Sequence, residues 1–493
     1  MASKDGLLAR LTQWIDSRLG LSHEMLRPVP AYAINPFYWL GALAVVAFAI
    51  QAVTGMLMLL YYVPSPTAAY SSTQYIFQSV SYGRFLETVH LYTAYAMIML
   101  AFMHMMRGYF VSVHKKPREA MWFVGMIMGF VTLGFGFTGY LLPWTVVSKS
   151  ATDVGLGMID ALPQPVSSFL SFLAVGAGGD ATELLRFFDL HIVVLPAILL
   201  ILLVVKMYML EVHGISEPVL GAPPSEKKSR LLPIFPDVSL YLLELAAAFG
   251  VLMLLISVVF PIGLPPQYTP QAASQYTAQP DWYFLWVYQI LKLSIFEQAG
   301  LPVALSIVSL VFIVLFLLPI VDRGEQRRIS GRPLFVTLGA ILVAEISVLT
   351  AWGLLTPGQA IPDEQAVLVL GGIALAVAIV TLVSYRLVLG GLGKAHAPDG
   401  AASSPTLRSA AAWTSGAFVL LLGLGTLAIA AVFNSLVGLA LDGADAASIE
   451  SLGFSLGALA LTVTGTIALI YRLDLGIGAV KRHVKFLEKG WGE

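Results

Sequence analysis

Residues 88–109 read TVHLYTAYAMIMLAFMHMMRGY, an apolar stretch that carries two histidines, His90 and His104, fourteen positions apart. At about 1.5 Å and 100° per residue, this spacing places both imidazoles near one face of a helix, about 21 Å apart along its axis. A histidine inside a membrane helix indicates a functional site, and haem iron is a common reason to bury imidazole in a helix bundle. Histidines bonded only to neighbouring backbone are the alternative. The stretch predicts a helix that holds two cofactors stacked across a membrane.

The composition of the chain is that of a membrane protein. Its 493 residues are 58% hydrophobic and 12% charged, with a mean hydropathy of +0.82, far too apolar for a soluble globular domain. We therefore expect an all-α polytopic protein whose helices each cross a hydrocarbon layer of roughly 30 Å. Ten spans are predicted, at residues 37–62, 84–110, 120–143, 184–210, 240–262, 301–321, 333–355, 365–389, 410–437 and 451–472.

The basic residues gather in one set of alternating loops, which holds 24 of the 28 lysines and arginines. By the positive-inside rule this side is cytoplasmic, and with ten spans both termini lie there. The net charge of −1 does not indicate a nucleic-acid partner. Because the chain has no cysteine, it holds no disulfide, no cysteine-ligated iron–sulfur cluster and no thioether-attached haem of its own.

Four segments are expected. Residues 1–36 alternate apolar and charged positions at helical spacing and predict an amphipathic helix on the membrane surface. Residues 37–220 hold four spans, and residues 221–355 hold three more. Residues 356–493 form an extension with three further spans, for which a structural or subunit-contact role is favoured. The long connection 144–183, on the outer side, is expected to form short amphipathic helices.

Glycines repeat the interval between the two histidines. The first span carries Gly41 and Gly55, and the third span carries Gly125 and Gly139, each pair fourteen residues apart. A single glycine in a membrane helix usually serves only close helix packing. Two pairs at this interval predict space for a flat macrocycle at the height of each histidine.

The fourth span, which runs in the same direction as the second, carries His191 near its outer end. A partner for His104 is expected about fourteen residues later, where the chain has Lys206. The next histidine, His213, lies about 10 Å further along the helix. The height of His213 does not match that of His104.

At this point the chain resembles a known family, the cytochrome b subunit of quinol-oxidising cytochrome bc and bf complexes. The matching pieces are GALAVVAFAIQAVTG, the two histidines of the second span, HMMRGYF, KKPRE, FTGYLLPW, RFFDLHIVVLP and GISEP. Residues 230–355, with PDWYF and RRISGRP, are similar to the second part of the family, which some relatives encode as a separate subunit. The resemblance covers about 70% of the chain and leaves out the last three spans.

The resemblance implies two b-type haems between the second and fourth spans. His90 and His191 would ligate the outer, lower-potential haem, and His104 the inner, higher-potential haem. Arg107 and Arg186 match arginines that pair with haem propionates, and for Arg186 a surface arginine is the alternative.

Two positions depart from the family pattern near the haems. Glu87 stands where the family usually has an arginine, so Arg84 becomes the candidate counter-charge for the outer haem. Lys206 matches the second ligand of the inner haem. A neutral amine can bind iron, and burial favours the neutral form of lysine. The alternatives are a five-coordinate haem with Lys206 near a propionate, ligation by His213, or loss of this haem.

The segment PDWYF matches a motif at the outer quinol-oxidation site of the family, where glutamate is more common than aspartate. Asp281 would accept a quinol proton and release it outwards, with Tyr283 beside it. An aromatic belt at the membrane interface is the alternative. The third span would line the same pocket with Tyr140, Leu142, Pro143 and Trp144.

The resemblance implies a quinol:cytochrome c oxidoreductase that sends electrons through both haems to a quinone site on the cytoplasmic side and translocates protons. The expected partners are a Rieske iron–sulfur protein, a c-type cytochrome, quinone and a second copy of the complex, in a bacterial or archaeal cytoplasmic membrane. One alternative is a di-haem anchor that links quinone to a dehydrogenase. An alternative of another class is a proton-coupled secondary transporter, which predicts a colourless protein.

Overall fold

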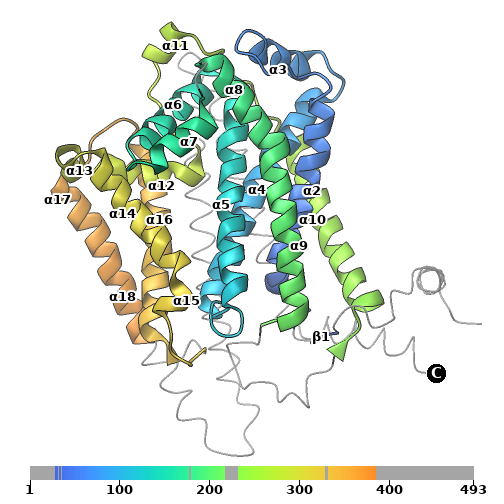
Figure 1. Cartoon of the computed structure of the whole chain (residues 1–493), viewed down its shortest axis with the longest axis vertical. Coiled ribbons are helices and arrows are strands. Elements are labelled where there is room, and N and C mark those ends of the chain that lie inside the picture. The colour runs from blue at the N-terminus through green and yellow to red at the C-terminus, as the bar shows by residue number, and fades with distance from the viewer. Residues whose placement is uncertain are drawn as a thin grey trace, which may run out of the picture.

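The protein, seen in a computed structural model, is a bundle of long upright helices with shorter helices at one end (Figure 1). The structure describes residues 28–30, 33–34, 36–176, 179–216, 231–327 and 331–384. Among these residues, seven helices are long and apolar enough to cross a membrane, at Leu40–Met58, Gly83–Phe110, Glu119–Leu141, Thr182–His213, Ile234–Val259, Pro333–Leu355 and Asp363–Val383. The all-α polytopic class predicted from the sequence is confirmed, and the chain is an integral membrane protein.

The first part of the chain supplies the four central helices and the short helices above them. Its elements are β1 (Val29–Pro30), the 3-10 helix η2 (Pro36–Tyr38), α2 (Leu40–Met58), α3 (Ala69–Gln78), α4 (Gly83–Phe110), α5 (Glu119–Leu141), α6 (Val146–Asp160), α7 (Val166–Ala174), α8 (Asp180–Asp189), the π-turn η3 (Leu190–Val194) and α9 (Leu195–His213). The expected short helices of residues 144–183 are present as α6 and α7.

The second part of the chain packs beside this bundle. Its elements are β2 (Leu231–Leu232), the π-turn η4 (Ile234–Val238), α10 (Ser239–Val259), α11 (Pro270–Ser274), α12 (Trp282–Leu291), α13 (Ser294–Ala299), α14 (Leu301–Phe316), α15 (Leu318–Val321), α16 (Pro333–Leu355), α17 (Asp363–Ala366), the π-turn η6 (Val367–Gly371) and α18 (Gly372–Ser384). The two parts meet at one end through β1 and β2, which pair antiparallel.

The predicted span 301–321 is wrong in one respect, because it is not a single helix. α14 ends at Phe316, and α15 begins two residues later with Pro319 in its first turn. Proline lacks the amide hydrogen that would continue the helical ladder and its ring clashes with the preceding turn, so the helix breaks there. The 16 residues of α14 rise about 24 Å, less than the roughly 30 Å of a hydrocarbon layer.

Several predictions fall on residues outside the described ranges. The spans expected at 410–437 and 451–472 lie there, and so does most of the surface helix expected over residues 1–36.

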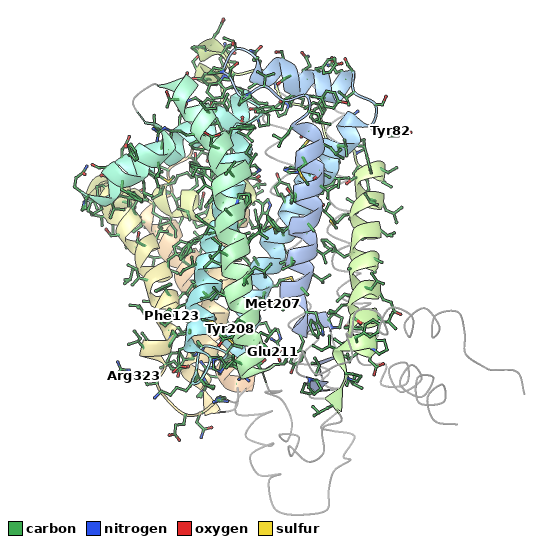
Figure 2. The ribbon with its side chains drawn as sticks, turned by 45° about the vertical axis from the view of Figure 1, so that its right-hand side comes forward. Tyr82, Phe123, Met207, Tyr208, Glu211 and Arg323 are labelled. Atoms are coloured by element: carbon green, nitrogen blue, oxygen red, sulfur yellow. The ribbon has the colours of Figure 1, made fainter. Side chains whose placement is uncertain are left out.

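The helices pair in a way that brings distant sequence segments together. α2 packs along α4, and α5 packs along α9. We call the end where α3, α6, α7 and α8 gather the upper end, and the opposite end, with the turn between α4 and α5, the lower end (Figure 1). In Figure 2, Tyr82 lies at the upper end and Arg323 at the lower end, while Met207 and Tyr208 project from α9. Both α9 side chains are exposed, as expected of a face in contact with lipid.

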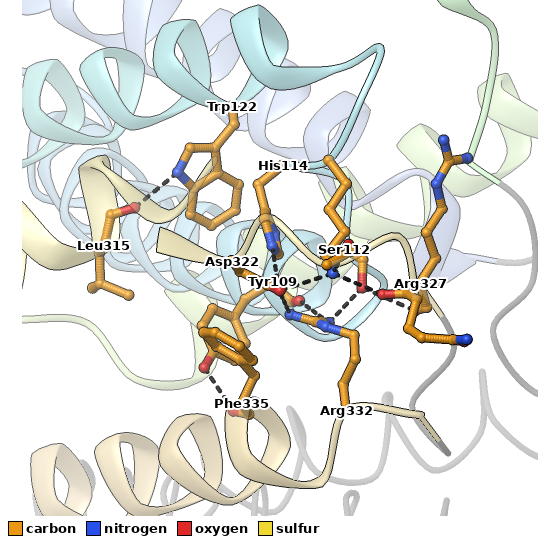
Figure 3. Close-up of polar contacts among 12 residues, drawn as sticks. Tyr109, Ser112, His114, Trp122, Leu315, Asp322, Arg327, Arg332 and Phe335 are labelled. Carbon is orange, nitrogen blue, oxygen red and sulfur yellow. Dashed lines mark hydrogen bonds and ion pairs between the residues drawn. The ribbon is translucent and has the colours of Figure 1, made fainter. Parts of the chain in front are cut away.

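A buried charged cluster joins the two parts at the lower end (Figure 3). Asp322, before α16, lies 2.8 Å from Lys115 Nζ and 2.9 Å from His114 Nε2, both on the α4–α5 turn, and also pairs with Arg332. The Lys115 ammonium donates further bonds to two carbonyls of the α15–α16 connection. Since these side chains are almost fully buried, removal of one partner would leave an uncompensated charge.

Candidate functional site

The site begins with two histidines that face each other near the upper end, which we call the upper pair. His90 lies on α4, and His191 lies in the π-turn η3 that leads into α9. Pro196 follows in the first turn of α9 and has no amide hydrogen to donate. Just before it, the Leu195 amide bonds to the Leu190 carbonyl five residues back. π-turns are rare in proteins, and those that do occur lie frequently at functional sites.

The two rings of the upper pair are close but do not stack. Their centroids lie 6.4 Å apart and their planes are inclined by 61°. A metal–imidazole bond is about 2 Å long in zinc sites, so this separation leaves room for one metal ion bound by both rings.

A glycine on the neighbouring helix faces each histidine of the upper pair. A β-carbon added to Gly55 on α2 would lie 3.4 Å from Cε1 of His90, and one added to Gly139 on α5 would lie 2.5 Å from Cε1 of His191. The second distance is well below van der Waals contact. Both glycines therefore leave room for these imidazoles on the neighbouring helices. That they also leave room for a flat macrocycle stays a prediction.

Two threonines that the sequence reasoning missed bind the upper pair. Thr54 Oγ1 lies 2.8 Å from His90 Nδ1, and Thr138 Oγ1 lies 3.1 Å from His191 Nδ1. Each threonine directly precedes one of the glycines of this level. The dipeptide Thr-Gly at both places is a signal in the sequence that could have identified them.

The lower pair, His104 on α4 and Lys206 on α9, repeats this arrangement. A β-carbon on Gly41 would lie 3.1 Å from His104 Cε1, and one on Gly125 would lie 2.9 Å from Lys206 Nζ. Lys206 is close enough to interact electrostatically with His104, and its ammonium donates a hydrogen bond to the Met121 carbonyl. The lower pair thus offers one imidazole and one amine at one height.

His213, the alternative partner for His104, ends α9 at the lower end. Its backbone carbonyl accepts a hydrogen bond from Arg118. The seven residues from Lys206 to His213 rise about 10 Å, so the histidine lies well below the lower pair.

The residues of both pairs fit haem groups in chemistry and shape. Imidazole nitrogen is the usual axial donor in b-type haem proteins, and a neutral amine is a nitrogen donor of similar kind. The four glycines leave the helix surfaces open at both heights, where any larger residue would meet the donor side chain. The upper pair offers two imidazoles, and the lower pair offers a mixed set.

A buried carboxylate lies at the start of α12. Asp281 accepts a hydrogen bond from the Trp282 amide at 2.7 Å and another from the Tyr95 hydroxyl. Only 5% of Asp281 is exposed. Burial raises the pKa of this carboxyl to about 7, although both hydrogen bonds favour the ionised form. The side chain can therefore take up or release a proton near neutral pH. Tyr95 is a partner that the sequence reasoning missed.

Tyr283, two residues after the carboxylate, contacts the helix that borders the upper pair. Its hydroxyl lies against Gly136 of α5, where an added β-carbon would be 2.8 Å from the oxygen. Gly136 is one helical turn from Gly139, which faces His191. The aromatic side chain thus lies between α12 and the helix that borders the upper pair.

The residues predicted at the end of the third span lie around the same upper end. Trp144 is buried, with its ring centroid 6.2 Å from that of Tyr268, and Tyr140 is close enough to Asp281 for an electrostatic interaction. The Leu142 carbonyl accepts a hydrogen bond from Tyr62. Pro143 adjoins these residues in the chain.

The three arginines expected to pair with haem propionates bind protein groups. Arg107 lies 4.1 Å above the Tyr38 ring and donates to Ser216, at the lower end. Arg186 donates to the Phe172 carbonyl of α7, and Arg84 donates to two carbonyls after α10. Arg107 follows His104 by one turn of α4.

Comparisons with known proteins identify the family to which the chain belongs. Residues 26–214 match the family model described as cytochrome b/b6/petB, and residues 271–379 match the one described as cytochrome b(C-terminal)/b6/petD. The second match includes most of α18.

Three relatives illustrate the extent of the similarity. A cytochrome bc complex cytochrome b subunit of Chlorobaculum thiosulfatiphilum is 30% identical, over 70% of this chain and 81% of that protein. A cytochrome b of Sulfolobus acidocaldarius is 31% identical, over 72% and 67%. A cytochrome b6 of Heliobacterium mobile is 38% identical, over 42% and 99%. A chain of a hyperthermophilic respiratory Complex III has the same fold, with a TM-score of 0.57 and 24% identity, over 76% and 98%.

Proposed function

Since this chain belongs to the cytochrome b family, we propose that it is the membrane subunit of a bc-type complex that oxidises quinol at the upper end of the bundle. The family implies haem b as the cofactor. The observation that carries the proposal is the upper pair, in which two imidazoles from different helices face each other, each beside a glycine. His104, fourteen residues further down α4, and Lys206 on α9 form the lower pair, which would hold a second cofactor at a different depth.

His90 and His191 would hold the upper haem, and His104 and Lys206 the lower one. Lys206 Nζ lies against Gly125 of α5, as the His191 ring lies against Gly139 fourteen residues further along the same helix, which supports the amine as the second ligand. Arg107, one turn below His104, would bind a propionate of the lower haem, and Arg186 one of the upper haem. When bound, the two haems would supply one-electron transfer between the two ends of the bundle.

Asp281 would act as the proton acceptor for quinol at the upper end. Its pKa of about 7 makes the carboxylate available at neutral pH and keeps it basic enough to take a hydroxyl proton. Tyr95 orients this carboxylate through a hydrogen bond, and the Tyr283 hydroxyl lies against Gly136, one turn from the glycine that faces His191. Tyr140, Pro143 and Trp144 would line the quinol pocket.

The complex requires partners, because this chain contains no cysteine. A Rieske iron–sulfur protein and a c-type cytochrome would take one electron of each quinol. The other electron would cross the bundle to a quinone site near Arg107 at the lower end. In this arrangement the upper end faces outwards and the lower end faces the cytoplasm, so that quinol oxidation releases protons outside. A homodimer of the complex in a bacterial or archaeal cytoplasmic membrane is expected.

The proposal is tested by redox titration and low-temperature electron paramagnetic resonance of the purified complex, together with its Lys206→His variant. We expect two low-spin b haems, of which only one changes its signal and potential in the variant. A high-spin lower haem that becomes low-spin in the variant would show that Lys206 does not bind iron. His213→Gln is the matched control and is expected to leave both haems unchanged. A colourless protein would overturn the proposal and favour a transporter, and a single haem would refute the electron path.

A further inference from the structure

Thr54 and Thr138 determine which ring nitrogen carries the hydrogen in each histidine of the upper pair. Each threonine is buried, and each hydroxyl already donates its only proton to a carbonyl of its own helix, at 2.8 Å from Ile50 O and 2.8 Å from Gly134 O. The hydroxyl oxygen can therefore only accept from the imidazole. Nδ1 must carry the hydrogen, which leaves the lone pair on Nε2 of each histidine free for a metal.

The lower pair lacks this arrangement. The positions that precede Gly41 and Gly125 are Leu40 and Val124, which have no hydrogen-bond acceptor in their side chains. Correspondingly, Nδ1 of His104 has no hydrogen-bond partner within the part of the chain that the structure describes. The fourteen-residue repeat thus preserves the glycines at both levels but places threonine only at the upper one.

A hydrogen bond donated by the second ring nitrogen raises the basicity of a ligating imidazole and fixes its orientation. A more basic ligand stabilises the oxidised, more positive iron and lowers the reduction potential. From this contrast we propose that Thr54 and Thr138 are positioning residues that lower the potential of the upper haem relative to the lower one. This inference rests on the proposed function. On this inference, two threonines that do not bind iron set the potential difference that drives electrons from the upper haem to the lower one.

The test compares Thr54→Val, Thr138→Val and the double variant with wild type by redox titration of each haem, followed optically and by electron paramagnetic resonance. Valine keeps the shape and removes the hydroxyl acceptor. At His191 the Phe135 carbonyl, which also forms a hydrogen bond with the ring, remains, so the larger shift of the two single variants is expected for Thr54→Val. Loss of a hydrogen-bond partner behind a metal ligand typically costs about 10- to 100-fold in metal affinity or activity. Taking the lower end of that range as the scale, we expect the reduced-to-oxidised ratio of the upper haem at a fixed potential to rise about tenfold in the double variant. For one electron this equals about 59 mV. The potential of the lower haem should not change. Thr54→Ser, which keeps the hydroxyl, should leave the potential of the upper haem as in wild type.

Thr132→Val is the matched control. Thr132 lies on α5, is buried, and donates to the Met128 carbonyl in the same way, but within the described part of the chain it has no hydrogen bond to a histidine. We expect this variant to leave both potentials unchanged. A control that shifts the upper potential as much as Thr138→Val would show a general packing effect and overturn the inference.

Leu40→Thr provides a gain-of-function test that does not depend on weakening the upper site. Leu40 precedes Gly41 as Thr54 precedes Gly55, so a threonine there is placed to accept from His104 Nδ1. We expect the lower haem to fall in potential while the upper haem stays unchanged. If the valine variants and Leu40→Thr all bind two haems and none of them changes a potential, this inference is overturned while the proposed function stands. A wild-type protein without haem would overturn the proposed function and this inference together.

Discussion

Gly139→Ala is expected to expel the upper haem, whereas Gly55→Ala is expected to retain it. The β-carbon at Gly139 would lie 2.5 Å from His191 Cε1, about 0.9 Å closer than the 3.4 Å at which ordinary contact begins. The ring cannot move away freely, because Thr138 holds its Nδ1. Overpacking of this kind costs about 1–3 kcal/mol, which corresponds to a loss of roughly 5- to 150-fold in haem affinity. At Gly55 the β-carbon would lie 3.4 Å from His90 Cε1, an ordinary contact.

The assay is the haem content of the two purified variants, with resolved spectra of the upper and lower haems and circular dichroism as the control for folding. We expect Gly139→Ala to lose up to half of its haem, all of it from the upper site, while the circular dichroism shows the same helix content as wild type. Full haem content with an unchanged upper spectrum in Gly139→Ala would refute the reasoning. An equal loss in Gly55→Ala would refute it too, since the contact distance would then not be the cause.

Three further predictions concern other parts of the molecule. Asp281→Asn removes the proton acceptor and is expected to lower quinol-dependent turnover at least about 100-fold; in wild type, kcat/KM should rise with pH up to about 7, and a flat profile would contradict this role. Burial lowers the pKa of His114 to about 4, so its neutral form is favoured in the folded state. The stability this contributes is present above the unfolded pKa of about 6.5 and is lost as pH falls towards 4, by about 3 kcal/mol at most. His114→Gln should flatten the decline in melting temperature over that range, and an equally steep decline in the variant would exclude His114 as its cause. Finally, Gly339→Ala would place a β-carbon 2.4 Å from the Tyr109 ring and should reduce stability by about 1–3 kcal/mol in thermal melts. Gly250→Ala, whose added β-carbon would have no neighbour within 4 Å among the described residues, should be neutral or slightly stabilising, and an equal loss in both variants would contradict the steric explanation.

The fold class could be predicted from the sequence because a membrane span needs only a run of apolar residues of fixed length. The same regularity placed His90 and His104 on one face of a helix, and Gly41 and Gly55 at matching heights on another. The division between α14 and α15 was missed because the run 301–321 is apolar throughout, so its hydropathy predicts one continuous helix. The proline in this run interrupts the helical hydrogen bonds, which hydropathy does not register.

The sequence by itself determined which residues occur at which height: the helix periodicity fixes both the interval between donors and the interval between glycines. Only the tertiary structure decided which helix each residue faces. α2 packs on α4 and α5 on α9, so that Thr54 meets His90 and Thr138 meets His191. The start of α12 packs against α4, so that Tyr95 meets Asp281. The physical reason is that the periodicity of one helix gives no information about its rotation against another. That rotation follows from the packing of side chains across the whole bundle.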